Sequence, residues 1–472
     1  MQIGDEKIME QELKVYNPAD GTLAGTLSML DEEAFQAVIE KAMNAKKEWR
    51  ETSIYDRTVL MEYFMELVLE NAEELAEILT AEMGKPIVQA REEIAAAIDI
   101  TRSFVQRANH LYGEVLNADN QPGYNRDLIF TRREPLGAIA CIIPFNYPIK
   151  LLIHKVIPAL IMGNVVLAKA PSDNPLAIIK LCSLFEKAGF PEGVIQAFVC
   201  SRELSNQYLI ENPSIQAVSL TGSTKVGVQM SRAGAETMKH MFMELGGNDG
   251  TIVREDADVD FAVEEITKGR MVNAGQTCCA CKRILVHRSL EKEFTSKLCQ
   301  RFAALRTGDP RDESTDVGTV ISERAAQRVE QQIQLTISQG AVCLAGGTRN
   351  GAFIQPTILG NVTRDMDISK DMEIFGPVVP IIAFDTDEEA LEIINQSSFG
   401  LSSGIITKNI PKAVWMAGKI EAGAVVLNGQ GNYRHTEQGF GGVKMTGHSR
   451  EGVSATLEEY SRVKHYIMRS VL

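Results

Sequence analysis

The sequence is poor in aromatic residues and in positive charge. Phenylalanine, tryptophan and tyrosine make up 6% of its 472 residues, and 48 lysines and arginines face 62 aspartates and glutamates, which gives a net charge of −14. Such a surface repels nucleic acids and anionic membranes, and no basic run with interleaved aromatic residues offsets it. We therefore expect neither nucleic acid nor a membrane among the partners of this protein.

A long apolar run is also missing. The longest, Val156–Leu167, is interrupted by Pro158 and by Gly163-Asn164 and is too short to cross a bilayer. The first ten residues are polar and acidic, unlike a secretory signal. These features predict a cytoplasmic protein. The length and the 44% content of hydrophobic residues predict more than one domain.

The cysteines are not arranged as a disulfide scaffold. Eight are spread over the chain, which suits a reducing compartment, but Cys278, Cys279 and Cys281 crowd together. Cys278 and Cys281 have the C-x-x-C spacing of half a zinc site. No second pair completes four ligands, so we expect no metal. The cluster is compatible with a nucleophilic thiolate and with a redox-active pair.

Short apolar runs alternate with amphipathic segments over most of the chain. After a helical first third, this pattern predicts an α/β fold whose parallel sheets are covered by helices on both faces. The pair Gly246-Gly247 is the best domain boundary, with a second crossover near Gly423. Helices are expected at 31–49, 55–83, 87–111, 149–162, 176–188, 261–271, 290–305, 323–339 and 388–395, and strands at 127–132, 137–143, 165–168, 194–199, 215–220, 251–253, 284–286, 378–384 and 424–427.

Two segments carry side chains suited to covalent chemistry. Residues 273–281, Asn-Ala-Gly-Gln-Thr-Cys-Cys-Ala-Cys, follow an expected helix, where a thiolate can act as a nucleophile. Buried small residues in a turn would give the same pattern. Residues 243–248, Met-Glu-Leu-Gly-Gly-Asn, end an expected strand, and Glu244 can serve there as a general base. A solvated turn is the alternative.

Two further segments follow expected strands. Residues 220–227 lead into a helix whose N-terminus can bind a phosphate near Gly222 and Ser223. The segment lacks the G-x-G-x-x-G pattern, and a turn capped by Ser223 is the alternative. Residues 144–148, Pro-Phe-Asn-Tyr-Pro, place the Asn146 amide where it can donate to an oxyanion. A proline-bounded turn would have the same sequence.

Together and in this order, the four segments resemble the aldehyde dehydrogenase superfamily over nearly the whole chain. Residues 373–377, 395–401 and 439–452 add to the resemblance. It implies two open parallel-sheet, Rossmann-like domains plus a small β oligomerisation arm. We expect a cofactor-binding domain over 1–117 and 137–246, a catalytic domain over 247–422, an arm and C-terminal strand over 118–136 and 453–472, and a segment 423–452 that returns to the cofactor domain and lines the substrate entrance.

The resemblance implies catalytic roles. Cys278 would attack the aldehyde to form a thiohemiacetal, Asn146 would hold its oxyanion together with the Cys278 N–H, and Glu244 would activate water to hydrolyse the thioester left by hydride transfer. The coenzyme-A-acylating branch usually has Asn at position 244, so that reaction is disfavoured. Lys155 and Glu451 match a proton-relay pair of the family, with a structural ion pair as the alternative.

An NAD(P)+ site is implied as well. Its expected contacts are Lys169, Ser172, Gly222, Ser223, Gly227, Glu373 and Phe375. The lysine would reach the adenosine ribose, and Gly222 and Ser223 would contact the pyrophosphate. Glu373 and Phe375 would contact the nicotinamide ribose and its pocket. Many NAD-preferring members carry Glu where this chain has Ser172. Because serine does not repel a 2′-phosphate, we expect NADP+ to be accepted beside NAD+.

The resemblance defines the substrate less well. Succinate-semialdehyde members place arginines where this chain has His154 and Val272, which disfavours that aldehyde. Residues 145–148 and 432–434 look like the lactaldehyde and non-phosphorylating glyceraldehyde-3-phosphate branch. Arg434 can pair with a substrate phosphate or carboxylate, or form a surface or subunit contact. A small polar or anionic aldehyde is preferred. The expected pocket residues are Phe145, Tyr147, Leu151, His154, Thr277, Cys279 and the loop 429–438.

The family resemblance also implies a homo-oligomer, a dimer or a tetramer. In it the arm joins the C-terminal strand around 464–468 in a neighbour's sheet, by strand addition across subunits. Three other functions are compatible with the sequence: a catalytically silent member with a structural role, a redox sensor that uses Cys278 and Cys281, and an esterase that uses the same thiol without a cofactor.

Overall fold

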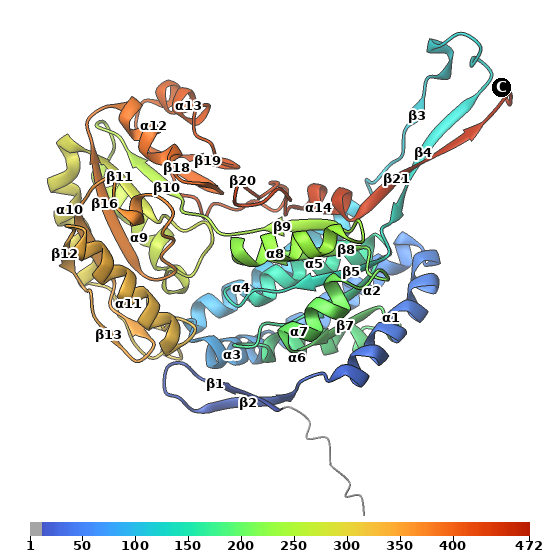
Figure 1. Ribbon diagram of the computed structural model, residues 1–472, viewed down its shortest axis with the longest axis horizontal. Helices are drawn as coiled ribbons and strands as arrows, with labels where there is room; N and C mark the ends of the chain where they lie inside the picture. The colour runs from blue at the N-terminus through green and yellow to red at the C-terminus, as the bar shows by residue number, and fades with distance from the viewer. Residues whose placement is uncertain (1–11) are drawn as a thin grey trace, which may run out of the picture.

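A computed structural model describes residues 12–472 of the chain. Two lobes lie side by side, one blue to green and the other yellow to orange, and a narrow arm projects from the first (Figure 1). Each lobe encloses its own buried hydrophobic core around a mainly parallel sheet. The predicted α/β architecture with open parallel sheets is confirmed.

The sheet of the first lobe has the strand order β7-β6-β5-β8-β9, and all its pairs are parallel. The chain runs outward from the central strand to one edge and then crosses to the other side. The carboxyl ends of β5 and β8 therefore flank a topological switch point, where open α/β sheets bind ligands. The strands are β5 (Ala138–Ile142), β6 (Val165–Lys169), β7 (Ile195–Phe198), β8 (Ala217–Thr221) and β9 (His240–Glu244).

Helices surround this sheet. The single helix expected over 55–83 is wrong: the chain forms two helices that meet at Asn71, whose side-chain amide donates to the Leu67 carbonyl at 2.7 Å. A hairpin of β1 (Glu12–Tyr16) and β2 (Leu23–Ser28) precedes them and was not expected. The helices are α1 (Glu32–Glu51), α2 (Ile54–Glu70), α3 (Ala72–Met83), α4 (Ile87–Ala108), α5 (Pro148–Ile161), α6 (Leu176–Lys187), α7 (Arg202–Ser205) and α8 (Thr224–Ala235).

The second lobe contains a seven-stranded sheet with the order β12-β15-β16-β11-β10-β18-β19. Its pairs are parallel except at one edge, where β12 runs antiparallel to β15. The strands are β10 (Gly250–Val253), β11 (Arg283–His287), β12 (Val342–Ala345), β15 (Thr357–Val362), β16 (Val378–Phe384), β18 (Ser402–Ile406) and β19 (Ala424–Leu427), and the helices are α9 (Val259–Met271), α10 (Arg288–Ala303), α11 (Glu323–Ser338), α12 (Asp387–Asn395) and α13 (Ile410–Ala417).

The strand pairing of the two sheets shows where the chain passes from one lobe to the other. The first sheet ends with β9 at Glu244, and the second begins with β10 at Gly250, on either side of Gly246-Gly247. The second crossover is displaced from the expected position 423, because β19 still pairs with β18. We therefore place the return toward the first lobe after Leu427. In the returning region the short strand β20 (Val443–Lys444) pairs with β17 (Phe399–Gly400), which precedes β18.

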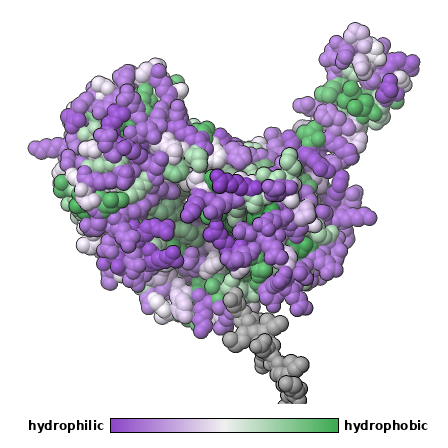
Figure 2. Space-filling model, viewed as in Figure 1, coloured by the Kyte–Doolittle hydropathy of each residue, from purple (hydrophilic) through white to green (hydrophobic). Residues whose placement is uncertain are grey.

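The arm is a three-stranded antiparallel sheet of β3 (Val115–Leu116), β4 (Leu128–Pro135) and β21 (Ser461–Met468). Strand β21 follows helix α14 (Val453–Glu459) in the chain. The arm and the C-terminal strand thus pair within one chain. Apolar side chains gather on the arm (Figure 2), among them Val115 and Ile467, which are 73% and 62% exposed. Strand addition to a neighbour's sheet stays a prediction. Among residues 12–472, no helix combines the length and the apolarity required to span a bilayer.

Candidate active site

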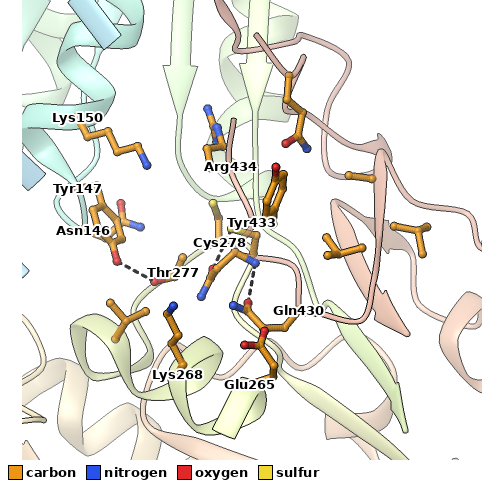
Figure 3. A pocket seen from close by; sticks show the side chains of 18 of the residues that line it. Asn146, Tyr147, Lys150, Glu265, Lys268, Thr277, Cys278, Gln430, Tyr433 and Arg434 are labelled. Carbon is orange, nitrogen blue, oxygen red and sulfur yellow. Dashed lines mark hydrogen bonds between the residues drawn. The ribbon is translucent and has the colours of Figure 1, made fainter. Parts of the chain in front are cut away.

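A cavity of about 790 Å³ opens around Cys278 where the lobes meet. Its walls come from the first turn of α5, from α9, from the loop at 277–279 and from β19 with the loop that follows it. Figure 3 shows Asn146 and Tyr147 on one side of Cys278, and Gln430 and Tyr433 on the other. The cavity therefore brings together segments that are almost 300 residues apart in the sequence.

The turn before Cys278 has an unusual backbone. Asn273 and Ala274 adopt left-handed conformations, with φ of 52° and 51°, and Gly275 follows with φ of 76°. A Cβ atom at Gly275 would lie 2.2 Å from the Gly376 carbonyl oxygen, so only glycine fits there. Non-glycine residues in this region store strain and concentrate at functional sites. The turn redirects the chain after α9 so that Cys278 faces the cavity.

Asn146 lies between β5 and α5, beside this turn. The side-chain amide of Asn146 donates to the backbone carbonyl of Gln276 at 3.0 Å. The backbone carbonyl of Asn146 accepts a hydrogen bond from the Asn273 side chain at 2.8 Å. A primary amide has two N–H donors, so the second hydrogen can serve an oxygen in the cavity. Asn146 and Cys278 both line that cavity. The geometry suits Asn146 as an oxyanion donor.

A buried ion pair that the sequence did not reveal supports Asn146. Lys85 contacts Glu93, and both side chains are fully buried. Lys85 also donates to the Asn146 carbonyl at 3.1 Å. Glu93 accepts from the backbone N–H groups of Ile149 and Lys150 and so caps the start of α5. The position of Glu93 on the buried face of an amphipathic helix was the available signal.

Glu244 ends β9 and is 2% exposed. Its Oε1 atom is buried without a hydrogen-bond partner among residues 12–472. Burial first, and then the negative charge of a Cys278 thiolate, raise the pKa of the Glu244 carboxyl well above its usual value. A carboxylate with a raised pKa is a stronger base, and this orphaned oxygen suits a group that activates water.

The Cys278 thiol is less acidic than a free cysteine. A hydrogen bond with the Cys279 side chain, together with burial, raises its pKa well above the usual value, against the opposing charges of Lys282 and Arg434. A base is therefore needed to generate the thiolate. Cys281 has different surroundings: its thiol donates to the Ile266 carbonyl at 3.6 Å and lies in the core of the second lobe.

Lys155 and Glu451 form the expected pair, 2.7 Å apart and buried. Arg434 binds the other carboxylate oxygen of Glu451 at 3.2 Å and stacks on the Phe440 ring at 3.7 Å. Burial would raise the pKa of Glu451, but the charges of Lys155 and Arg434 hold it well below its usual range. The geometry is that of a structural ion pair, and a proton relay stays a prediction.

The expected cofactor residues lie along the carboxyl edge of the first sheet. Lys169 ends β6, Ser172 follows it exposed, and Gly222 lies between β8 and α8. Ser223 occupies the N-cap of α8 but makes no side-chain capping bond, so the predicted alternative of a serine-capped turn is wrong. A Cβ atom at Gly227 would lie 2.5 Å from the Leu245 side chain. Glycine at this position therefore allows α8 to pack close to β9. The uncapped helix start fits the phosphates of a dinucleotide.

Glu373 and Phe375 approach from the second lobe. The Phe375 ring packs on Phe145 at 5.9 Å between ring centroids. Glu373 binds Lys282 at 2.8 Å, a residue that sequence reasoning did not single out. The residues expected to bind a dinucleotide therefore come from both lobes.

The expected substrate residues divide into two groups. Tyr147, Leu151, Thr277, Cys279 and Arg434 line the cavity. Phe145, which packs on Phe375, and His154, which is 1% exposed on the buried side of α5, do not line this cavity, and their contacts with a substrate stay predictions. Burial lowers the pKa of His154 well below its usual value, so its ring is neutral. Residues of the cavity wall that were missed include Lys150, Glu265 and Lys268.

Comparison with known proteins decides the family. The model of the aldehyde dehydrogenase family matches residues 5–466. The chain belongs to this family. A 3-sulfolactaldehyde dehydrogenase of Priestia megaterium is 34% identical over 466 residues, covering 98% of this chain and 96% of that protein. The predicted aldehyde dehydrogenase fold and enzyme class are thereby confirmed.

Solved structures of this family carry either cofactor. The glyceraldehyde-3-phosphate dehydrogenase GapN of Methanocaldococcus jannaschii in complex with NADP has a TM-score of 0.92 and 35% identity, with 97% of this chain and 99% of that one covered. An aldehyde dehydrogenase of Bacillus cereus in complex with NAD+ has a TM-score of 0.93 and 32% identity, with 97% and 93% covered.

Proposed function

We propose that this aldehyde dehydrogenase oxidises a small anionic aldehyde to the carboxylic acid, with NAD(P)+ as cofactor and Cys278 as nucleophile. The observation that carries the proposal is one cavity in which Cys278 and the Asn146 amide face three cationic side chains. Glu244, with its unpartnered oxygen, supplies the base. No feature supports the silent or redox-sensing alternatives over this one.

In the proposed reaction, each of these residues has a separate role. Cys278 loses its proton to solvent, and its thiolate attacks the aldehyde carbon to form a thiohemiacetal. The Asn146 amide and the Cys278 N–H hold the oxyanion. NAD(P)+, when bound, supplies the hydride acceptor. Glu244 then takes a proton from water, which hydrolyses the thioester and releases the acid.

Ser172 bears on the choice of cofactor. It lies exposed three residues after Lys169, at the carboxyl end of β6, and presents no negative charge. A 2′-phosphate is therefore not repelled there. We expect wild-type enzyme to reduce NADP+ at a rate at least comparable to that with NAD+.

Replacement of Ser172 by glutamate is expected to lower kcat/KM for NADP+ by about tenfold or more, because a carboxylate would repel the 2′-phosphate. The value for NAD+ is expected to stay the same or rise. Initial rates at 340 nm over a range of both cofactors measure the change. Ser172→Gln is the matched control of similar size without charge. An equal loss with both cofactors would contradict the assignment.

The cavity wall indicates an anionic substrate. Lys150 on α5 and Lys268 on α9 enter it from either side of Cys278, and Arg434 lies on the same side as Lys150 (Figure 3). Among residues 12–472, no carboxylate forms an ion pair with Lys150 or Lys268. Burial, and next the charge of Arg434, lower the pKa of Lys150. An anion bound between these side chains would stabilise the Lys150 ammonium.

The relatives are consistent with this interpretation. The names of the Priestia and Methanocaldococcus enzymes specify aldehydes that bear a sulfonate and a phosphate. In this chain Arg434 already binds Glu451, so Lys150 is the cation best placed to add recognition of such a group. On the α9 side of the cavity, the carboxylate of Glu265 faces the cations and limits the total positive charge of the cavity.

Replacement of Lys150 by methionine is expected to lower kcat/KM for anionic aldehydes by about tenfold to a hundredfold, since a charge-assisted hydrogen bond contributes about 1.5–3 kcal/mol. Neutral aldehydes of equal length are expected to change less than about threefold and serve as the internal control. Lys268→Met tests the opposite wall, where a smaller loss is expected because Lys268 is exposed. Equal losses for charged and neutral aldehydes would contradict this role.

The experiment that tests the function itself is a panel of carboxylated, sulfonated, phosphorylated and neutral aldehydes, crossed against NAD+ and NADP+ and followed at 340 nm. We expect reduction of cofactor, with the charged aldehydes preferred. Ester hydrolysis without cofactor reduction would favour an esterase. No turnover of any aldehyde would contradict the proposal.

A further inference from the structure

Lys282 is a buried cation that the proposed reaction does not use. Its side chain is 1% exposed, and its ammonium has three acceptors. These are a Glu373 carboxylate oxygen at 2.8 Å, the Gly247 carbonyl at 2.7 Å and the Cys278 carbonyl. Because an ammonium has three N–H donors, all of them are engaged. The residue lies four positions after the nucleophile, immediately before β11.

The acceptors of Lys282 come from three functional segments. Glu373 is the carboxylate expected at the nicotinamide ribose, Gly247 follows the segment of the base Glu244, and Cys278 is the nucleophile. The ammonium also lies 5.7 Å from the centre of the Phe375 ring. Its charge favours the Cys278 thiolate, against the effects of Cys279 and burial. One side chain thus contacts the cofactor segment and the nucleophile segment at once.

We propose that Lys282 is a positioning residue that ties Glu373 to the peptide carbonyl of Cys278, so that occupation of the ribose site changes the reactivity of the Cys278 thiol. A ribose hydroxyl that donates to Glu373 competes with Lys282 for the same carboxylate. The ammonium then shifts toward its two carbonyl acceptors and leaves more of its charge for Cys278. Coupling of this kind is reciprocal for equilibria, so ionisation of the Cys278 thiol changes dinucleotide affinity by the same factor by which the dinucleotide changes the ionisation constant of the thiol.

The inference rests on the proposed cofactor site, but its test needs no aldehyde turnover. The rate of Cys278 alkylation by iodoacetamide, followed by mass spectrometry, is measured alone, with saturating ADP-ribose and with AMP. ADP-ribose carries the second ribose and AMP does not. We expect ADP-ribose to change the wild-type rate about threefold or more and AMP to leave it unchanged. In Lys282→Met the ADP-ribose effect is expected to disappear.

The basal rate separates positioning from general packing. Lys282→Met is expected to slow alkylation about tenfold at neutral pH, the equivalent of one pKa unit. Glu373→Gln is expected to accelerate it, because the charge of Lys282 is then uncompensated. If the substitutions acted only through loss of packing, the alkylation rate would change in the same direction in both variants. Lys239→Met is the matched control: Lys239 is another buried lysine, but its acceptors are the Asn212 and Ile215 carbonyls, which belong to neither the Glu373 nor the Cys278 segment.

Two results would overturn the inference: an ADP-ribose effect of equal size in wild type and Lys282→Met, or changes in the same direction in Lys282→Met and Glu373→Gln. An absent ADP-ribose effect in wild-type protein that binds ADP-ribose by calorimetry would overturn it too. Failure of wild-type protein to bind ADP-ribose would contradict the proposed cofactor site, and the coupling with it, without bearing on Cys278 as nucleophile.

Discussion

Cys278→Ala is expected to reduce aldehyde oxidation by at least about a thousandfold, with cofactor binding retained. The thiol is the only group in the proposed reaction that forms a bond to the substrate carbon, and removing a covalent nucleophile costs more than removing any assisting group. Alanine leaves the left-handed turn at 273–275 intact, since it changes no backbone contact there. The measurement is NAD(P)H formation at 340 nm, with cofactor binding followed by calorimetry.

The neighbouring cysteines supply matched controls. Cys281→Ala removes a thiol that lies in the core of the second lobe, so we expect less than a threefold change in kcat and some loss of stability. Cys279→Ala removes the hydrogen bond that raises the pKa of Cys278. We expect faster alkylation of Cys278 in that variant at neutral pH. Comparable losses of activity in the Cys278 and Cys281 variants would instead support a redox pair.

The sequence predicted most of the fold because strands and helices here have clear periodicity. The buried strands β5, β6 and β8 are continuous apolar runs, and each is followed by a helix. The two departures from the predicted fold have different causes, one local and one distant in sequence. The amide of Asn71 divides one expected helix into two, and an apolar period cannot reveal such a break. Strand β19 keeps to the second sheet because of its pairing partner β18, which lies far away in sequence.

The site was predictable only where chemistry is local. Cys278, Glu244 and Asn146 each lie in a short segment with a recognisable neighbourhood. Lys150 and Lys282 do not: each is one lysine in an ordinary segment, and its importance comes from what the fold places around it. The position of His154 outside the cavity wall depends on the fold in the same way. One turn of α5 beyond Lys150, His154 faces the Phe104 ring in the core rather than the cavity.

The last prediction concerns Glu244, whose replacement by glutamine is expected to stop the reaction after the thioester has formed. Glutamine keeps the shape of the side chain but cannot accept a proton from water, and loss of a general base costs about 10²–10⁴-fold. If thioester hydrolysis alone depends on Glu244, rapid mixing should show a burst of one NAD(P)H per active site. An acyl adduct on Cys278 should then persist and be visible by mass spectrometry.

The pH profile sharpens this test. Burial and the charge of Cys278 raise the pKa of Glu244, and the base acts only when deprotonated, so the steady-state rate of wild type should rise with pH through that raised pKa and then level off. Glu244→Gln should lose this dependence. Glu82→Gln is the control: burial raises the pKa of Glu82 to about 8, but its carboxylate caps α6 at Leu176 and Ala177, and Cys278 is not among the groups that shift this pKa. A Glu244→Gln enzyme without either burst or adduct would show that the carboxylate is required to form the thiolate as well, which places both proton transfers on the one residue whose buried oxygen has no other partner.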